Sequence, residues 1–116
     1  MTEKSIFSRI IDGEIPAEIL YQDDLCFVIR DIAPKAPTHL LLIPKNPIPR
    51  LVDTDSDDQA LLGHLMVTAG KVASAAGIGD AFRLIVNNGA EAGQTVFHLH
   101  LHILGNLTMS ENSLGF

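Results

Sequence analysis

Three histidines alternate with apolar residues near the C-terminal end of the sequence, in the run His98-Leu-His-Leu-His102. Successive side chains of a β-strand point to opposite faces, so a strand here places the three imidazoles on one face, over about 13 Å at ~3.3 Å per residue. Leu99, Leu101 and Ile103 then face the core. Neutral imidazole can attack phosphorus, move protons or bind a metal ion, so the spacing predicts a chemically active strand face.

Three interpretations of this face compete. The first, a row of solvated polar residues, is disfavoured because strand surfaces prefer threonine and charged residues to imidazoles that repel one another when protonated. The second is a metal site, since His-x-His is a common ligand spacing, but the flanking residues 94–96 and 105–106 supply no carboxylate. The third is nucleophilic attack on phosphorus. A fourth histidine, His39, opens another expected strand and joins the cluster if the two strands pair.

The glycine-rich segment 87–96 precedes the histidines and favours the phosphorus chemistry. Gly93 lets the backbone approach a ligand closely. The N–H groups of Thr95 and Val96, with the Thr95 hydroxyl and the Asn87 carboxamide, can surround an anion. An ordinary turn role for Asn87 is an equally good interpretation.

Composition narrows the classes of protein that could carry this chemistry. The 116 residues suffice for one domain, and a hydrophobic fraction of 47% supports a core and excludes a disordered chain. Acidic residues outnumber basic ones 14 to 8, which argues against a nucleic-acid surface and leaves any phosphate to local donors. No apolar run suits a membrane helix, the first residues do not form a signal peptide, and Cys26 is the only cysteine. We therefore expect a cytoplasmic protein without a disulfide or a membrane partner.

The elements that position the histidines follow from apolar periodicity and from breaker residues. We expect a short helix with Ser5 as N-cap and Gly13 after its end, and a hairpin of residues 17–21 and 25–29. Further strands are expected at 39–43, 82–86 and 96–104, and a long helix at 56–76. The order predicts a single α+β domain over residues 1–116, with helix packed on a mainly antiparallel sheet and a peripheral tail at 107–116.

The long helix carries two further expectations. Ser56 and Gln59 have the spacing of a capping box. The apolar face is expected to hold the residues that recur at helical spacing, which are Leu61, Leu62, Leu65, Met66, Ala69, Val72, Ala73 and Ala76. The opposite face is small and mildly apolar at Gly63, Val67, Gly70 and Ser74, which favours a helix contact in a symmetric dimer. His64 lies beside the apolar face and is interpreted as a boundary residue without chemistry.

These residues resemble a known family. The run His98–Leu104 matches the histidine-triad pattern His-φ-His-φ-His-φ-φ, in which φ is apolar, at every position. The segment 93–96 is similar to the Gly-Gln-Ser-Val that precedes the pattern in the Hint branch, the histidine-triad nucleotide-binding proteins. The sequence is identified as a member of the histidine triad (HIT) family, Hint branch, with similarity from about Ile6 to Gly105.

The resemblance implies a fold and an activity. The fold is a five-stranded, mainly antiparallel sheet with one long and one short helix, joined to a second sheet across a homodimer. The activity is hydrolysis of the P–N bond of purine nucleoside phosphoramidates, including AMP-amines and acyl-AMP, with no cofactor and no metal. A dinucleoside polyphosphate hydrolase and a nucleotide-binding interaction protein with little turnover are the alternatives.

The resemblance also implies roles for particular residues. His100 is the nucleophile that forms a covalent AMP-histidine, His102 contacts the phosphate and the leaving group, and His98 and His39 orient His100. Asp31 accepts the ribose hydroxyls of AMP, GMP or adenosine. The remaining nucleotide contacts are the phosphate-holding residues Asn87, Gly93, Gln94, Thr95 and Val96 and the base-lining residues Phe7, Ile10, Ile15, Ile29 and Ile32.

The sequence departs from the family pattern at three places. Thr95 stands where serine is usual, which keeps the hydroxyl and adds a methyl group. Asn106 stands where a second glycine is common, at the turn out of the last strand. The tail 107–116 does not resemble the tryptophan-containing end of animal members, so the leaving group is the property that transfers least.

Overall fold

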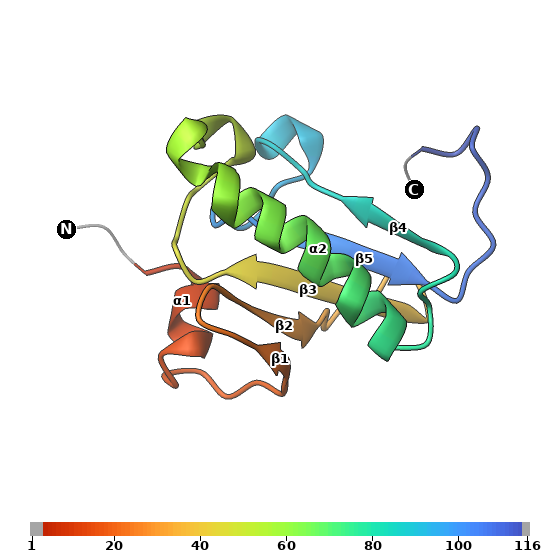
Figure 1. The fold of residues 1–116 in the computed structure, drawn as a ribbon, viewed down its shortest axis with the longest axis horizontal. Helices are drawn as coiled ribbons and strands as arrows, with labels where there is room; N and C mark the ends of the chain where they lie inside the picture. Colours follow the sequence, from red (N-terminus) through yellow and green to blue (C-terminus); the bar gives the residue numbers. More distant parts are fainter. Residues whose placement is uncertain (1–3, 115–116) are drawn as a thin grey trace.

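A five-stranded antiparallel sheet carries the histidine run in the computed structural model, which describes residues 4–114 (Figure 1). The strand order is β1-β2-β3-β5-β4. The expected α+β fold is therefore confirmed. The strands are β1 (Ile19–Gln22), β2 (Cys26–Arg30), β3 (Thr38–Pro44), β4 (Phe82–Ile85) and β5 (Leu101–Gly105), and the α-helices are α1 (Ile6–Ile11) and α2 (Gln59–Ala75).

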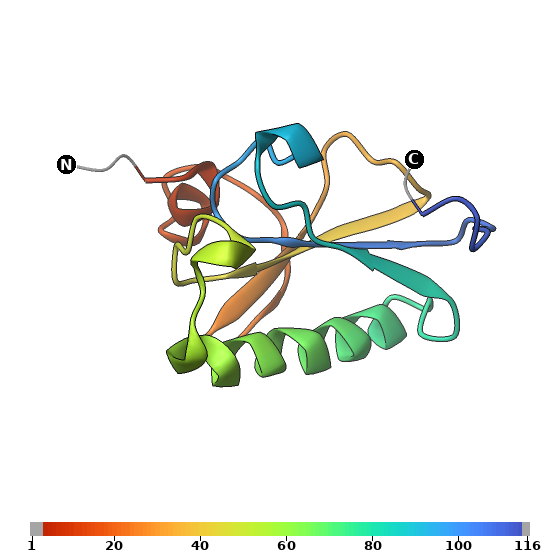
Figure 2. The same cartoon turned by 90° about the horizontal axis from the view of Figure 1, so that it is seen from above.

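The two helices lie on opposite faces of the sheet (Figure 2). Alternation along β3 directs Leu40 and Leu42 toward α2, while Leu41 and Ile43 face α1. One core thus lies between the sheet and α2, and a smaller one lies under α1. In residues 4–114, no helix is long and apolar enough to cross a bilayer.

Local capping fixes α1 as the sequence predicts. The Ser5 hydroxyl accepts a hydrogen bond from the Ser8 N–H at 3.0 Å, which satisfies one free donor of the first turn. Gly13 follows the helix with φ of 81°, a left-handed conformation that suits glycine. The helix therefore has defined ends, and Phe7 and Ile10 are buried against the sheet.

Two expectations for α2 are wrong in detail. The capping box is made by Asp55 and Asp58, not by Ser56 and Gln59, because a 3-10 turn at Ser56–Asp58 precedes the α-helix. The buried face matches the expected one at Leu65, Ala69, Val72 and Ala73, and Thr68 also belongs to it, but Ala76 is exposed. Met66 is 58% exposed, since it lies about 100° around the helix from Leu65.

The last strand is shorter than the expected 96–104. Its ladder with β3 runs from Leu42↔Leu101 to Thr38↔Gly105, and residues 96–98 form a bend. The Leu99 N–H donates to the Ile48 carbonyl at 2.7 Å instead of to a neighbouring strand. Side chains nevertheless keep alternating through this segment, so Leu99 packs in the core under α2.

Asn106 forms the turn that leaves β5. Its φ of 59° is left-handed, a region that asparagine tolerates better than most residues, and its side chain donates to the Thr38 hydroxyl at 2.7 Å. Arg83 of β4 then holds the tail through the carbonyls of Ser110 and Ser113. The tail is therefore attached beside β4.

Candidate active site

Pairing of β3 with β5 brings the fourth histidine to the triad. The register places Leu41 opposite His102 and His39 opposite Leu104, so His39 and His102 share the face that α1 covers. His39 Nε2 lies 2.9 Å from His102 Nδ1, and the ring centroids are 5.1 Å apart. His100 lies at the same centroid distance from His102. The expectation that His39 joins the cluster is confirmed.

Hydrogen bonds to the backbone assign the proton positions of His39 and His102. The Lys35 N–H donates to His39 Nδ1 at 3.0 Å, so a neutral His39 carries its proton on Nε2. That Nε2–H donates to His102 Nδ1. His102 is therefore protonated on Nε2, and this N–H remains as a donor toward a ligand.

The two histidines that precede β5 are oriented in the same way. His98 Nε2–H donates to the Pro44 carbonyl at 2.7 Å, and its Nδ1 accepts from the Ser5 hydroxyl. His100 Nδ1–H donates to the His98 carbonyl at 2.7 Å. In neutral His100 the lone pair therefore lies on Nε2, the nitrogen that could attack phosphorus.

Burial keeps the surrounding imidazoles uncharged. His98 is fully buried, and burial lowers its pKa against the opposing bond to the Pro44 carbonyl. Burial also lowers the pKa of His39, even though Asp31 lies nearby. For His102, burial and then the charges of His100 and His39 lower the pKa to about 4. Near pH 7 these three imidazoles are neutral, and the solvated-surface interpretation fails.

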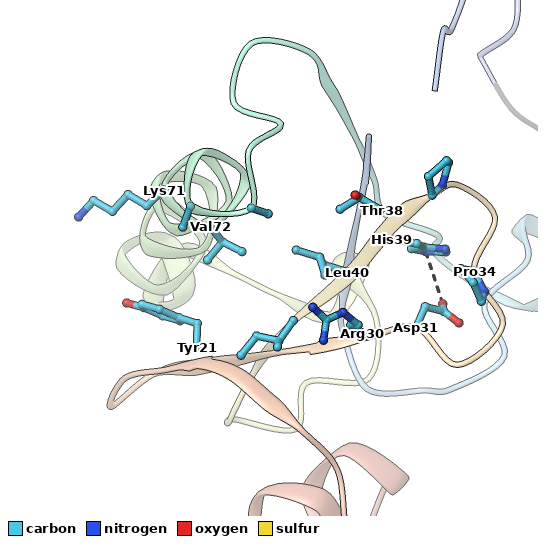
Figure 3. A pocket seen from close by; sticks show the side chains of 13 residues that line it. Tyr21, Arg30, Asp31, Pro34, Thr38, His39, Leu40, Lys71 and Val72 are labelled. Carbon is cyan, nitrogen blue, oxygen red and sulfur yellow. Dashed lines mark ion pairs between the residues drawn. The ribbon is translucent and has the colours of Figure 1, made fainter. Parts of the chain in front are cut away.

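Asp31 adds a carboxylate that the residues flanking the triad in the sequence do not provide. Its Oδ1 accepts from the Ala33 N–H at 2.8 Å, and its Oδ2 lies 3.4 Å from His39 Nε2 (Figure 3). The donor atoms of Asp31, His39 and His102 lie within 4.8 Å of one another. This set could hold a metal ion, with a carboxylate that comes from the end of β2 and not from the residues flanking the triad.

The loop before the triad is shaped by two glycines and one buried amide. Gly89 and Gly93 have φ of 93° and 95° on either side of a 3-10 turn, Ala90–Ala92. The Gln94 side chain accepts from the Gly89 N–H and donates to the Pro49 and Val96 carbonyls at 2.8 to 3.1 Å. Gln94 therefore supports the loop from inside the protein.

Two neighbouring N–H groups of this loop are available to a ligand. Within residues 4–114, no hydrogen bond occupies the N–H of Thr95 or of Val96. The Asn87 side chain lies next to Gly93: a Cβ atom placed on this glycine would be 3.6 Å from Asn87 Nδ2. Asn88 instead accepts from the Val52 N–H at 2.8 Å. The loop can thus offer an anion the backbone of 95–96 with Asn87 beside it.

The residues expected to line a base divide into two groups. Phe7 packs edge-on against His98 and His100, with centroids 5.6 and 5.0 Å apart. The others under α1 are the buried Ile10 and Ile29 and the half-buried Ile15. Ile32, next to Asp31, is 100% exposed. Water covers a large apolar side chain there, so a flat apolar ligand would gain by packing against it.

A groove lies mainly on the α2 side of β3 and reaches the start of that strand. It has a volume of about 590 Å³ and extends between the β1–β2 hairpin and the C-terminal half of α2, with Leu40, Tyr21 and Val72 in its wall. In Figure 3 the side chains of Leu40 and His39 leave β3 on opposite sides. Asp31 and His39 also line the groove, so it adjoins the histidine cluster at the start of β3.

Sequence reasoning missed the groups that orient the imidazoles. Ser5 is 93 residues from His98, and its only visible signal was that of a helix cap. The Pro44 carbonyl and the Lys35 N–H are backbone atoms, which no residue type announces. These partners appear only when the strands are paired.

Comparison with known proteins gives one consistent family. The family model of the HIT domain matches residues 12–109. An uncharacterized HIT-like protein of Synechocystis sp. is 60% identical over 110 residues, 95% of this chain and 96% of that protein. The purine nucleoside phosphoramidase of Escherichia coli is 47% identical over 106 residues, 90% and 89% of the two chains. A HIT family hydrolase from Legionella pneumophila superposes with a TM-score of 0.92 at 41% identity, over 97% of this chain and all of the other. With its three alternating imidazoles and the loop before them, the chain belongs to the HIT domain family.

Proposed function

We propose that this protein is a hydrolase that cleaves the P–N bond of purine nucleoside phosphoramidates through a nucleotide covalently bound to His100. The observation that carries the proposal is the hydrogen bond from His100 Nδ1 to the His98 carbonyl, which places the lone pair on Nε2. The similarity to an enzyme named purine nucleoside phosphoramidase supports the choice of substrate class.

The reaction has two displacements at the α-phosphorus. His100 Nε2 attacks phosphorus and the P–N bond to the amine breaks, so the amine departs and takes a proton. Water then attacks the same phosphorus, the bond to His100 Nε2 breaks, and the nucleoside monophosphate is released. His102 carries its proton on Nε2 and donates a hydrogen bond from it to the phosphate or the departing amine, and the amine takes its proton from solvent.

The proposed ligand position combines two backbone N–H groups that have no protein partner among residues 4–114 with the Asp31 carboxylate and the exposed Ile32. The N–H groups of Thr95 and Val96 bind the phosphoryl oxygens, where charge increases as phosphorus is attacked. Asp31 accepts the ribose hydroxyls, and the exposed Ile32 covers one side of the base. Gly93 holds the loop in its left-handed turn, and the role of Gln94 is to support it.

A homodimer in the cytoplasm completes the proposal. Met66 and Val67 on the outer face of α2 are 58% and 60% exposed, and Gly63 next to them has open space above it. Strand β4 is at an edge of the sheet and pairs only with β5 in the described chain. A second copy could cover both features. Light scattering of the purified protein tests this, and a monomeric mass at micromolar concentration would contradict it.

Trapping the covalent intermediate tests enzyme, nucleophile and substrate class together. The protein is mixed with an adenosine phosphoramidate, quenched in the steady state and digested, and the peptide that contains 98–102 is examined by mass spectrometry. We expect an added adenylyl group on His100. No adduct, or an adduct on His98 or His102, would contradict the mechanism. A diadenosine polyphosphate as the preferred substrate would contradict the substrate class.

A further inference from the structure

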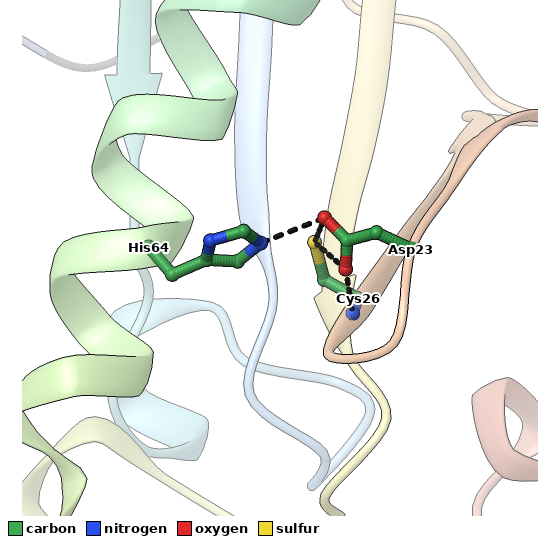
Figure 4. Close-up of side chains that lie close together, drawn as sticks. All are labelled: Asp23, Cys26 and His64. Carbon is green, nitrogen blue, oxygen red and sulfur yellow. Dashed lines mark hydrogen bonds and ion pairs between the residues drawn. The ribbon is translucent and has the colours of Figure 1, made fainter.

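A second group of side chains with metal-binding donor atoms lies at the opposite end of β2 from Asp31 (Figure 4). Asp23 is in the turn between β1 and β2, Cys26 begins β2, and His64 reaches them from α2. Cys26 is five residues before Asp31, about 17 Å along an extended strand, and faces α2 instead of α1. His64, interpreted from the sequence as a boundary residue without chemistry, is half-buried and has Asp23 as a hydrogen-bond partner.

The distances from Asp23 to the other two donor atoms are close to those around a tetrahedral ion. His64 Nε2 lies 2.7 Å from Asp23 Oδ2, and Cys26 Sγ lies 3.4 and 3.6 Å from the two carboxylate oxygens. All three ligand atoms lie within 4.8 Å of one another. With metal–sulfur and metal–nitrogen bonds of about 2.3 and 2.0 Å, tetrahedral ligands are roughly 3.3 to 3.6 Å apart. The His64–Asp23 pair would need to open by about half an ångström, and Cys26 Sγ and His64 Nε2, which lie within 4.8 Å of each other, would settle at roughly 3.5 Å.

The surrounding backbone holds the carboxylate in place. Asp23 Oδ1 accepts from the N–H groups of Leu25 and Cys26 at 2.8 and 2.9 Å, and Oδ2 accepts from the Tyr21 hydroxyl at 2.7 Å. Partial burial raises the pKa of Asp23, but the bonds from Tyr21, Leu25 and His64 outweigh it and hold that pKa well below its usual range. The carboxylate is therefore negatively charged at neutral pH and available to a cation.

The cluster is closed on one side and open on the other. Cys26 is fully buried, and burial with the neighbouring Asp23 charge raises the pKa of its thiol to about 12, so the thiol is protonated in the metal-free protein. The side chains of His64 and Asp23 are 35% and 25% exposed. An ion could enter from the His64 side and keep one water ligand there.

We propose that Asp23, Cys26 and His64 form a zinc site that fastens the β1–β2 turn to α2. One sulfur, one nitrogen and one carboxylate oxygen suit zinc, whereas magnesium and calcium prefer oxygen ligands alone. On binding, the thiol loses its proton to solvent, the proton on His64 Nε2 is replaced by one on Nδ1, metal–sulfur and metal–nitrogen bonds replace the hydrogen bonds of Cys26 and His64 to Asp23, and water fills the fourth position. Since the ligands come from a turn and a helix, the bound ion is expected to stabilise the fold.

Cobalt spectroscopy tests the proposal without any measurement of activity. Cys26 is the only cysteine in the sequence, so a thiolate-to-cobalt charge-transfer band in the near ultraviolet reports this residue alone. Metal-free protein is titrated with Co²⁺. We expect the band to saturate at one ion per chain and to disappear when Zn²⁺ is added. Zinc should also raise the Tm of the wild-type protein.

Three variants separate this site from the histidine face. Cys26→Ser should abolish the band, and His64→Gln, a change at a partly exposed residue, should weaken cobalt binding at least about tenfold. His102→Gln is the matched control, because it removes a histidine from the Asp31 cluster, and it should leave the band unchanged. Absence of the band with millimolar cobalt, or equal binding by wild-type protein and His64→Gln, would overturn the proposal. Loss of binding in His102→Gln alone would place the ion on the other face and also overturn it.

Discussion

The two ends of β2 carry two clusters made from similar residues in different surroundings. At one end Asp23 bonds directly to His64 at 2.7 Å, with a thiol on its other side. At the other end Asp31 lies 3.4 Å from His39, which bonds instead to a second imidazole. An aspartate, a histidine and one further donor therefore make two different sites on opposite faces of a sheet.

The two clusters differ in the protonation state that their surroundings stabilise: a charged carboxylate in one and a neutral imidazole in the other. Around Asp23, four donors favour the charged carboxylate and outweigh its partial burial. Around His102, burial and neighbouring imidazoles favour the neutral ring. A fixed negative charge is suited to holding a cation, and a row of neutral imidazoles with assigned protons is suited to nucleophilic and proton-transfer chemistry.

Substituting one histidine in each cluster should give the largest difference between the two clusters. His100→Ala should lower kcat for an adenosine phosphoramidate by at least about a thousandfold, because the nucleophile acts in the transition state. AMP affinity, measured by calorimetry, should stay within about tenfold. His64→Ala is the matched control and should keep kcat within about twofold. Comparable losses in both variants would remove the functional distinction between the clusters.

The two clusters should affect the free energy of unfolding in two different pH ranges. Below about pH 6.5 the unfolded chain protonates its histidines, while native His102 stays neutral down to a pKa of about 4 in the field of His100, His39, Asp31 and Lys35. The unfolded state thus binds more protons, and the free energy of unfolding should fall between pH 6.5 and 4, by up to about 3 kcal/mol for this group.

Asp23 should act in a lower window. Its native pKa is depressed, so its contribution is complete above about pH 4 and is lost as the pH falls further. Urea unfolding at a series of pH values measures both effects. His102→Gln should flatten the profile between pH 6.5 and 4, and Asp23→Asn should flatten it below pH 4. Identical profiles for the two variants would refute the assignment of the windows.

Much of the histidine face could be predicted from the sequence because alternation is a local property. Alternation places the side chains of His98 and His100 on the opposite face from Leu99. This holds even though the hydrogen-bonded ladder with β3 begins only at Leu101. The ladder does not extend to Leu99 because the Leu99 N–H donates to the Ile48 carbonyl instead. No local sequence pattern predicts this hydrogen bond.

The second cluster could not be predicted for the same reason. Asp23 has the signal of a turn residue, Cys26 that of a buried strand residue and His64 that of a helix boundary. Each of these interpretations is correct for its own element. Only the packing of α2 against the start of β2 brings the donor atoms together, 41 residues apart for Asp23 and His64. Contacts of this kind require the tertiary structure.

Ser5 tests whether the orientation of the triad depends on a residue outside it. Ser5→Ala removes the α1 cap and the donor to His98 Nδ1, so we expect a loss of about 1 kcal/mol in unfolding free energy and about a tenfold loss in kcat. A structural role alone would leave the pH profile of kcat unchanged, whereas loss of the orienting bond should shift it. Ser8→Ala, one turn along the same helix, should change kcat less than twofold.

The smallest expected effect concerns Ile32, the exposed apolar neighbour of Asp31. Ile32 is fully exposed beside Asp31, so Ile32→Ala should change the unfolding free energy by less than about 0.5 kcal/mol. If a purine packs on this side chain, AMP affinity should fall about five- to tenfold, from the loss of roughly 1 kcal/mol of apolar contact. Calorimetric titration measures this, and Val52→Ala, at another exposed apolar side chain, serves as the control. Unchanged affinity in Ile32→Ala would move the base away from Asp31, because an apolar side chain that touches the ligand cannot be shortened without cost. The histidine face would then need another surface for the base.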